Sequence, residues 1–309
     1  MNGHTRVGRA RRWHWVAVAG LGLACQSGGS DVAWSDYCPK DQAQVRQVPI
    51  AESALDELSG LAVSRKNASV LYAHNDSGDP ARFFAIGFDG AALGELQLKS
   101  ADAVDWEDIA VGPCPAGSCV YLGDIGDNLL DRNFYALYRV AEPVIDVAHP
   151  VEKQALAWEW FPFHYPNHAH YDSEALLVHP VTGDVYVITK RKGAEQTHVF
   201  RMAAPLRANT DVELIPVVEL AIPKEDEPPI TAGDIDPSGE RLLLRTNDRL
   251  YLSHVPSGQS FEAVFTASWE RLWVADETQG EAAAWLSSGA GYVTASESES
   301  PVLTVVDCP

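Results

Sequence analysis

Five short segments of the chain each place a polar or small residue beside an apolar run, and three of these residues are glutamates. The segments span residues 58–61, 104–111, 173–176, 232–235 and 280–283. They recur roughly every 50–70 residues, about the length of a four-stranded propeller blade with its loops. Packing alone does not explain three glutamates at matching positions. Aligned, the segments give one column of candidate metal ligands: Ser59, Glu107, Glu174, Gly233 and Glu281.

This column predicts a cation site if the chain is a propeller. The first strand of each blade lines the central channel, so equivalent positions form a ring. Three carboxylates in such a ring repel one another unless they are protonated or paired with a cation. Calcium is the expected ion because it takes six to eight hard oxygen ligands. At the fourth position Gly233 offers only its carbonyl, with Asp234 or Thr231 as substitutes. The alternative is that the glutamates cap backbone amides or pair with arginines.

Polar residues also follow the second strand expected in each repeat. Since that strand runs antiparallel to the first, its end lies on the same face as the column. Lysine and arginine side chains near a calcium ion favour binding of a phosphate-type anion. The alternative is that these polar residues are present only because turns favour Asn, Asp and Ser for backbone reasons. We expect ligand contacts from His74, Asn75, Lys190, Arg191, Arg245 and Glu297. As an enzyme, the protein would use Asp76, Asp124 or Asp127 to orient a water molecule.

The elements that must position these residues are β-strands. From about residue 43 onward, short β-branched and aromatic runs alternate with turn residues, and no long helical period competes. The fifth repeat holds only three strand candidates, and residues 43–50 can supply the missing outer strand. The sequence therefore predicts an all-β, five-bladed propeller closed by an N-terminal strand, or six blades if two have been merged.

The N-terminus is typical of an exported protein. Residues 1–24 read as a signal peptide, with a basic start and an apolar run too short to span a membrane comfortably. Residues 21–25 resemble a bacterial lipobox, although Gly22 stands where leucine is usual, so Cys25 is the expected lipidation site. Ordinary signal-peptide cleavage is the alternative. Residues 25–42 would then form the lipid-anchor tether and residues 43–309 the propeller domain.

Charge and cysteines agree with export. The formal net charge is −20, which argues against nucleic-acid binding. Without Cys25, four cysteines remain, an even number that favours disulfides over metal ligands. Cys38 and Cys308 lie near the two ends, and Cys114 and Cys119 flank one turn, so these are the two expected pairs.

The spacing of the five segments resembles that in the SdiA-regulated type of bacterial five-bladed propeller. The column is also similar to the calcium-binding ring of the calcium-activated nucleotidases, the apyrases, which read Ser, Glu, Glu, Ser, Glu. Gly233 departs from that pattern. The nucleotidases place basic residues at the end of the third blade's second strand, which Lys190 and Arg191 match.

These observations predict a calcium-binding propeller lipoprotein of the bacterial cell envelope, or a secreted one. It is expected to be a monomer that touches the membrane only through its lipid anchor. It would bind a small anionic ligand at the channel mouth, and as an enzyme would hydrolyse a phosphate ester or anhydride. The alternative is a non-catalytic module that binds an envelope partner and holds calcium for structure. Fold alone does not choose between these functions.

Overall fold

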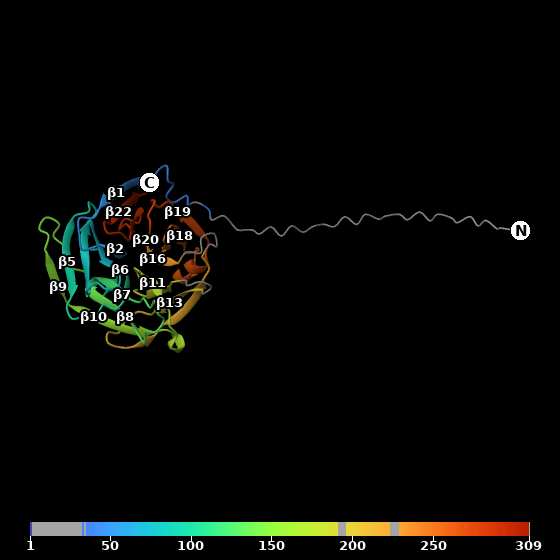
Figure 1. Ribbon diagram of the computed structural model, residues 1–309, viewed down its shortest axis with the longest axis horizontal. Helices are drawn as coiled ribbons and strands as arrows, with labels where there is room; N and C mark the ends of the chain where they lie inside the picture. Colours follow the sequence, from blue (N-terminus) through green and yellow to red (C-terminus); the bar gives the residue numbers. More distant parts are fainter. Residues whose placement is uncertain (2–32, 34, 191–195, 223–228, 309) are drawn as a thin grey trace. The chain divides into compact units, whose positions relative to one another are not determined.

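The computed structural model describes residues 1, 33, 35–190, 196–222 and 229–308. Apart from Met1, these belong to one compact unit, Asp31–Pro309. This unit is a ring of five β-sheets with almost no helix (Figure 1), so the predicted five-bladed propeller is confirmed. The expected signal peptide and Cys25 lie outside the described residues. Within those residues, no helix is both long and apolar enough to cross a membrane.

Each blade has four antiparallel strands that follow one another outward from the ring centre in chain order, except that β1 is the outermost strand of blade five. Blade one contains β2 (Leu58–Val63), β3 (Val70–Asn75), β4 (Arg82–Gly87) and β5 (Ala92–Leu98). Blade two contains β6 (Trp106–Cys114), β7 (Gly117–Asp124), β8 (Tyr135–Ala141) and β10 (Trp158–His164). Blade three contains β11 (Ser173–Val178), β12 (Val185–Thr189), β13 (Thr197–Met202) and β15 (Ile215–Leu220).

The remaining two blades follow the same plan. Blade four contains β16 (Ile230–Ile235), β17 (Arg241–Thr246), β18 (Leu250–His254) and β19 (Trp269–Leu272). Blade five contains β20 (Gly280–Trp285), β21 (Gly291–Ser296), β22 (Val302–Asp307) and β1 (Gln44–Pro49). Two short 3-10 helices, η1 (Pro166–His168) and η2 (Phe261–Thr266), lie in connections.

Two additional strands extend blades one and two. β9 (Lys153–Leu156) pairs in parallel with β5, and β14 (Val212–Glu213) pairs in parallel with β10. Each comes from a segment that belongs, along the chain, to the following blade. These strands cover part of an outer edge that would otherwise expose unpaired backbone groups.

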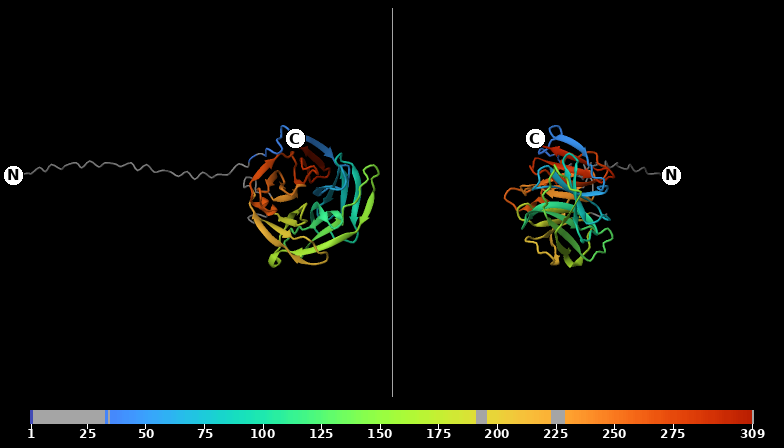
Figure 2. Two further views of the ribbon diagram at one scale, coloured as in Figure 1. Left: turned by 180° about the vertical axis from the view of Figure 1, so that it is seen from behind. Right: turned by 90° about the vertical axis from the view of Figure 1, so that its left-hand side faces the viewer.

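The ring is closed by the first strand of the propeller, as predicted. β1 pairs antiparallel with β22 from Gln44 opposite Asp307 to Pro49 opposite Val302. A disulfide between Cys38 and Cys308, with an S–S distance of 2.03 Å, joins the chain at the same seam. The second disulfide, Cys114–Cys119, links β6 to β7 across their hairpin. Both predicted pairs are therefore present. Figure 2 shows the ring from behind and from the side.

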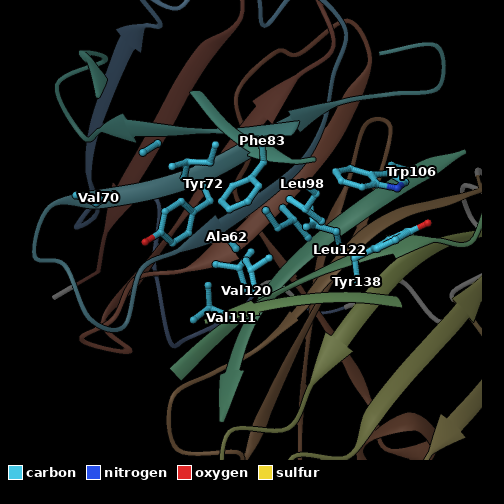
Figure 3. Packing of buried hydrophobic residues seen from close by; sticks show 14 of the residues in the cluster. Ala62, Val70, Tyr72, Phe83, Leu98, Trp106, Val111, Val120, Leu122 and Tyr138 are labelled. Carbon is cyan, nitrogen blue, oxygen red and sulfur yellow. The ribbon is translucent and has the colours of Figure 1, made fainter. Parts of the chain in front are cut away.

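The core consists of five apolar clusters, one between each pair of adjacent blades. Successive side chains of a strand point to opposite faces, so a blade strand contributes alternately to two clusters. In β3, Val70 and Tyr72 pack toward blade two, whereas Leu71 and Ala73 pack toward blade five. Figure 3 shows the cluster between blades one and two, where Tyr72 and Phe83 lie above Val120. Burial on both faces explains why the strands are apolar throughout.

Candidate metal and ligand site at the channel mouth

The inner strand of every blade is interrupted by a β-bulge at the same point. The register shifts fall between residues 58 and 60, 106 and 108, 173 and 175, 230 and 232, and 280 and 282. A bulge leaves one residue unpaired and redirects its side chain. The five unpaired residues form one ring at the start of the inner strands: Ser59, Glu107, Glu174, Thr231 and Glu281.

The fourth position is therefore Thr231, and the alignment that placed Gly233 there is wrong. Gly233 lies two residues further along β16, where an added Cβ would stand 2.9 Å from Leu177 and 3.0 Å from Leu244. It is a packing position. Gly233-Asp234 in blade four was aligned with the Glu-Ala pairs of other blades because it also stands beside an apolar run. Sequence spacing alone does not reveal the bulge that changes the alignment.

The two hydroxyl residues of the ring join neighbouring blades. Ser59 Oγ donates a hydrogen bond to the carbonyl oxygen of Glu107 at 2.7 Å. Thr231 Oγ1 donates to the carbonyl oxygen of Gly280 at 2.8 Å. These bonds fix the relative height of the inner strands of blades one and two, and of blades four and five.

Carboxylates converge on Glu107 from two sides. One carboxylate oxygen from each of Asp76, Asp105 and Glu107 lies within 4.8 Å of the other two. The same is true of Glu107, Asp172 and Glu174. Glu107 and Glu174 are each only 4% exposed. Oxygens bound to one calcium ion at about 2.3–2.6 Å are at most about 5 Å apart. The spacing within each group of three therefore suits one cation, and Glu107 belongs to both groups.

Asp105 and Asp172 were not among the predicted site residues, although the sequence contains a signal for them. Each stands two residues before a ring glutamate, in Asp105-Trp106-Glu107 and Asp172-Ser173-Glu174. Residues separated by two share one side of an extended chain. This repeated acid-x-acid pattern would have identified them.

A second ring surrounds the first at the mouth. It contains the residues that directly follow the second strands, of which Asp76, Lys190 and Glu297 are charged. Their backbone N–H groups donate to the carbonyl oxygens of Glu57, Asp172 and Gln279, at 2.9, 2.7 and 2.9 Å respectively. The Lys190 ammonium forms an ion pair with Glu174. In blade four the second-ring residue Asn247 donates through Nδ2 to Glu281 Oε1 at 3.1 Å.

Burial and mutual repulsion raise the pKa values of the acids in this cluster. The pKa of Glu107 is raised well above its usual range, first by burial and then by the charge of Glu174. Burial raises the pKa of Glu174 to about 8, against the opposing effect of Lys190. Burial, with Asp76 nearby, raises the pKa of Asp105 to about 6. Such shifts mean that the cluster holds too little positive charge to ionise fully at neutral pH.

Gly126 provides independent evidence that space is reserved around these oxygens. A Cβ added to Gly126 would lie 2.1 Å from Glu107 Oε1 and 2.5 Å from Asp105 Oδ2. Any side chain there would therefore occupy the region between the two carboxylates. The donor set is made of carboxylate oxygens, which suit calcium better than zinc or copper. The residues present thus fit the predicted ion.

The structure places His74 and Asn75 in the interior rather than at the mouth. His74 is fully buried behind Gly60, its Nδ1 lies 2.7 Å from the carbonyl oxygen of Asn75, and its ring packs edge-on to Trp106. Asn75 Nδ2 donates to the carbonyl oxygen of Ala54 at 2.7 Å. Both side chains serve the packing of blade one.

Arg245 is also buried, with no exposed surface. Its Nη2 donates to Glu277 Oε2 at 2.7 Å, and it lies so close to Gly280 that an added Cβ would meet Nη2 at 1.6 Å. This guanidinium cannot reach a ligand at the mouth without rearrangement. Arg191 lies outside the described residues.

Asp124 and Asp127 organise the loop between β7 and β8. Asp124 Oδ1 accepts from Arg132 at 2.6 Å and from the backbone N–H of Asp105 at 3.1 Å. Asp127 accepts from the Tyr135 hydroxyl at 2.7 Å and from the backbone N–H of Asp131 at 2.9 Å. Both are buried, and their partners explain their presence without a catalytic role. Of the three acids expected to orient water, Asp76 alone joins the carboxylate cluster.

Comparison with known proteins finds likenesses among solved structures. No protein-family model matches this chain, and no curated protein matches it. Among solved structures, it is similar to a gluconolactonase from Xanthomonas campestris described as important in glucose secondary metabolic pathways. The sequence identity is 12%, the TM-score is 0.43, and the match covers 81% of this chain and 72% of that one. The resemblance to SdiA-regulated propellers and apyrases stays a prediction.

Proposed function

We propose that this protein is an extracytoplasmic propeller that binds a calcium ion at its channel mouth and a small anionic ligand beside it. The observation that supports this most directly is the convergence of Asp105, Glu107, Asp172 and Glu174 around a space that Gly126 leaves open. Buried carboxylates are retained where they are paired or coordinate a metal. The ring residues supply the ion's ligands, with Ser59 and Thr231 at the two remaining positions.

Lys190 is the group that we assign to the anionic ligand. In the structure its ammonium pairs with Glu174, a member of the carboxylate cluster. An ion held by Glu174 repels the ammonium toward the open mouth, where its side chain is already 28% exposed. A phosphate, sulfate or carboxylate would then be attracted by both positive charges.

If the protein is an enzyme, it would hydrolyse a phosphate ester or anhydride bound at this site. Bound calcium would polarise the phosphoryl oxygen. Of the chain's own groups, Asp76 would orient the attacking water molecule, because it lies beside Asp105 and Glu107 at the edge of the carboxylate cluster.

A non-catalytic binding module is the second candidate, and one observation favours it. Asp124 and Asp127, which a hydrolase could use near the mouth, are committed to loop structure through Arg132 and Tyr135. The acids left near the proposed ion are then its expected ligands. In this form calcium stabilises the ring and Lys190 holds the partner's anion.

One experiment separates these candidates. Purified protein is melted with calcium and with a chelator, and turnover of a panel of phosphate esters and anhydrides is followed under both conditions. Calcium-dependent turnover supports the hydrolase, and calcium-dependent stabilisation without turnover supports the binding module. Equal melting temperatures with calcium and chelator would refute the metal site and the mechanism that depends on it.

The export assignment is also part of the proposal. Two disulfides suit an oxidising, extracytoplasmic compartment, and Cys25 is the expected anchor. Cys25→Ser should move the protein from the membrane fraction to the soluble fraction. Continued membrane attachment of the variant, or an intact mass without lipid for the natural chain, would contradict anchoring.

A further inference from the structure

A separate pocket lies at the other end of the channel, where the inner strands finish. It has a volume of about 280 Å³. The inner strands all run in one direction, since Ser59 bonds to Glu107 at their starts and Asp234 bonds to Trp285 at their ends. The pocket residues Ala62 and Asp234 lie three residues beyond the ring residues Ser59 and Thr231, roughly 10 Å along an extended strand, so this pocket is distinct from the carboxylate cluster. Its apolar lining consists of Ala62, Val63, Val111, Pro180, Ile235, Pro237 and Trp285.

Two opposite charges line this pocket without neutralising each other directly. Arg65 follows β2 and Asp234 lies in β16. Burial raises the pKa of Asp234 to about 6, and the charge of Arg65 is one of the influences that oppose this rise. No ion pair joins them, and among the described side chains none forms a salt bridge with Arg65. The guanidinium is therefore available to a bound anion.

The carboxylate of Asp234 is held in position by the backbone. Its Oδ2 accepts a hydrogen bond from the N–H of Trp285 at 2.8 Å. A carboxylate can accept about four hydrogen bonds, so it retains capacity for a donor from a ligand. The Trp285 side chain is 2% exposed, and its indole N–H has no partner among the described residues. A buried donor without a partner is costly unless a ligand or water satisfies it.

We infer that this pocket binds a small zwitterion of the amino-acid class, with its carboxylate facing Arg65 and its ammonium facing Asp234. The apolar side chain of the ligand would pack against Val63 and Val111. A ligand with only a carboxylate would be repelled by Asp234, and one with only an ammonium by Arg65. Opposed charges thus select for a molecule that has both. The volume lies at the small end of ligand pockets, which measure about 300–1,000 Å³.

The test is titration calorimetry of the full chain with three probes that share one ring: L-phenylalanine, 3-phenylpropionate and 2-phenylethylamine. At pH 7.5, L-phenylalanine should bind at least about tenfold more tightly than either singly charged analogue. Arg65→Gln should weaken its binding by about tenfold or more. Arg207→Gln removes an exposed arginine that lines a different surface pocket, and it should leave the affinity unchanged.

Three results would overturn the inference. These are no binding of L-phenylalanine up to about 10 mM, equal binding of 3-phenylpropionate, and unchanged affinity in Arg65→Gln. Repeating the titration with a chelator keeps this site apart from the proposed calcium site. Amino-acid binding should persist with chelator, so failure of either proposal leaves the other standing.

Discussion

The ammonium group of Lys190 forms an ion pair with Glu174 at the channel mouth, and the backbone N–H of the same lysine donates to the carbonyl oxygen of Asp172 at 2.7 Å. Lys190 is thereby attached both to Glu174 in β11 and to Asp172, the residue just before that strand. Its positive charge offsets part of the repulsion between Glu174 and Glu107. A divalent ion would perform the same task, so lysine and ion are expected to compete for Glu174.

Replacing Lys190 by glutamine tests this competition. Without the ammonium, the cluster loses a counter-charge, so at about pH 9, where Glu174 is ionised, the free energy of unfolding in chelator should fall by on the order of 2 kcal/mol. Added calcium should restore this loss, so the calcium-induced rise in melting temperature should be larger than in the natural chain. Lys99→Gln, at an exposed position, is the matched control. An identical calcium response in Lys190→Gln and the natural chain would argue against competition.

Glu174→Gln should nearly abolish stabilisation by calcium. The substitution keeps the shape of the side chain and removes the charge that the ion requires, and an ion that binds only the folded state stabilises it by mass action. Melting curves with calcium and with chelator measure the effect. Glu240→Gln, which removes an exposed carboxylate in the turn between β16 and β17, at the end of these strands away from the ring, should respond to calcium as the natural protein does.

The stability of the calcium-free protein should fall as pH rises from about 5 to 8. Burial raises the pKa of Glu174 from an ordinary 4.5 to about 8, so the folded state holds a proton in this range that the unfolded state has released. Stability falls with pH wherever the folded state binds more protons. Chemical denaturation in chelator across this range should show a shallower decline for Glu174→Gln. Calcium should also flatten the profile, since it favours the ionised carboxylate. Parallel profiles for the two proteins would contradict the raised pKa.

Gly126→Ala should damage the site although the substitution is small. The new methyl group would lie 2.1 Å from Glu107 Oε1, so carboxylate or backbone must move. Overpacking of this kind costs about 1–3 kcal/mol, and calcium stabilisation should be lost as well. Gly258→Ala adds a methyl group in open space at a backbone φ of +76°, and it should reduce stability while keeping the calcium response. A normal calcium response in Gly126→Ala would show that the ion binds elsewhere.

Removal of the disulfide at the closing seam should cost more than removal of the hairpin disulfide. Cys38 and Cys308 are separated by 270 residues, whereas Cys114 and Cys119 are separated by 5. The stabilisation from restricting the unfolded chain grows with loop length, within a range of about 2–5 kcal/mol. Urea unfolding of the two double Cys→Ser variants compares them directly. A smaller loss for the Cys38–Cys308 variant would mean that β1 holds the seam without the bond.

The sequence by itself determined the ring. Alternating apolar runs with turn residues predict blade strands, and the shortage of one strand in the last repeat predicts that residues 43–50 close it, as β1 does. Cysteine positions predicted both disulfides. These properties depend on local periodicity and on counting, which a linear sequence records. The same applies to Glu107, Glu174 and Glu281, each of which begins an apolar strand.

Only the tertiary structure decided which polar residues meet at the mouth. The bulge in each inner strand moves the ring from Gly233 to Thr231, because one unpaired residue reverses which side chains face the channel. Asp105 and Asp172 lie close to Glu107 because two neighbouring blades meet at the mouth. His74 and Arg245 instead turn inward, behind Gly60 and Gly280. Whether a side chain at the end of a strand turns outward or inward depends on the space left by the adjacent blade. That space is a property of the closed ring, and no single segment of the sequence contains it.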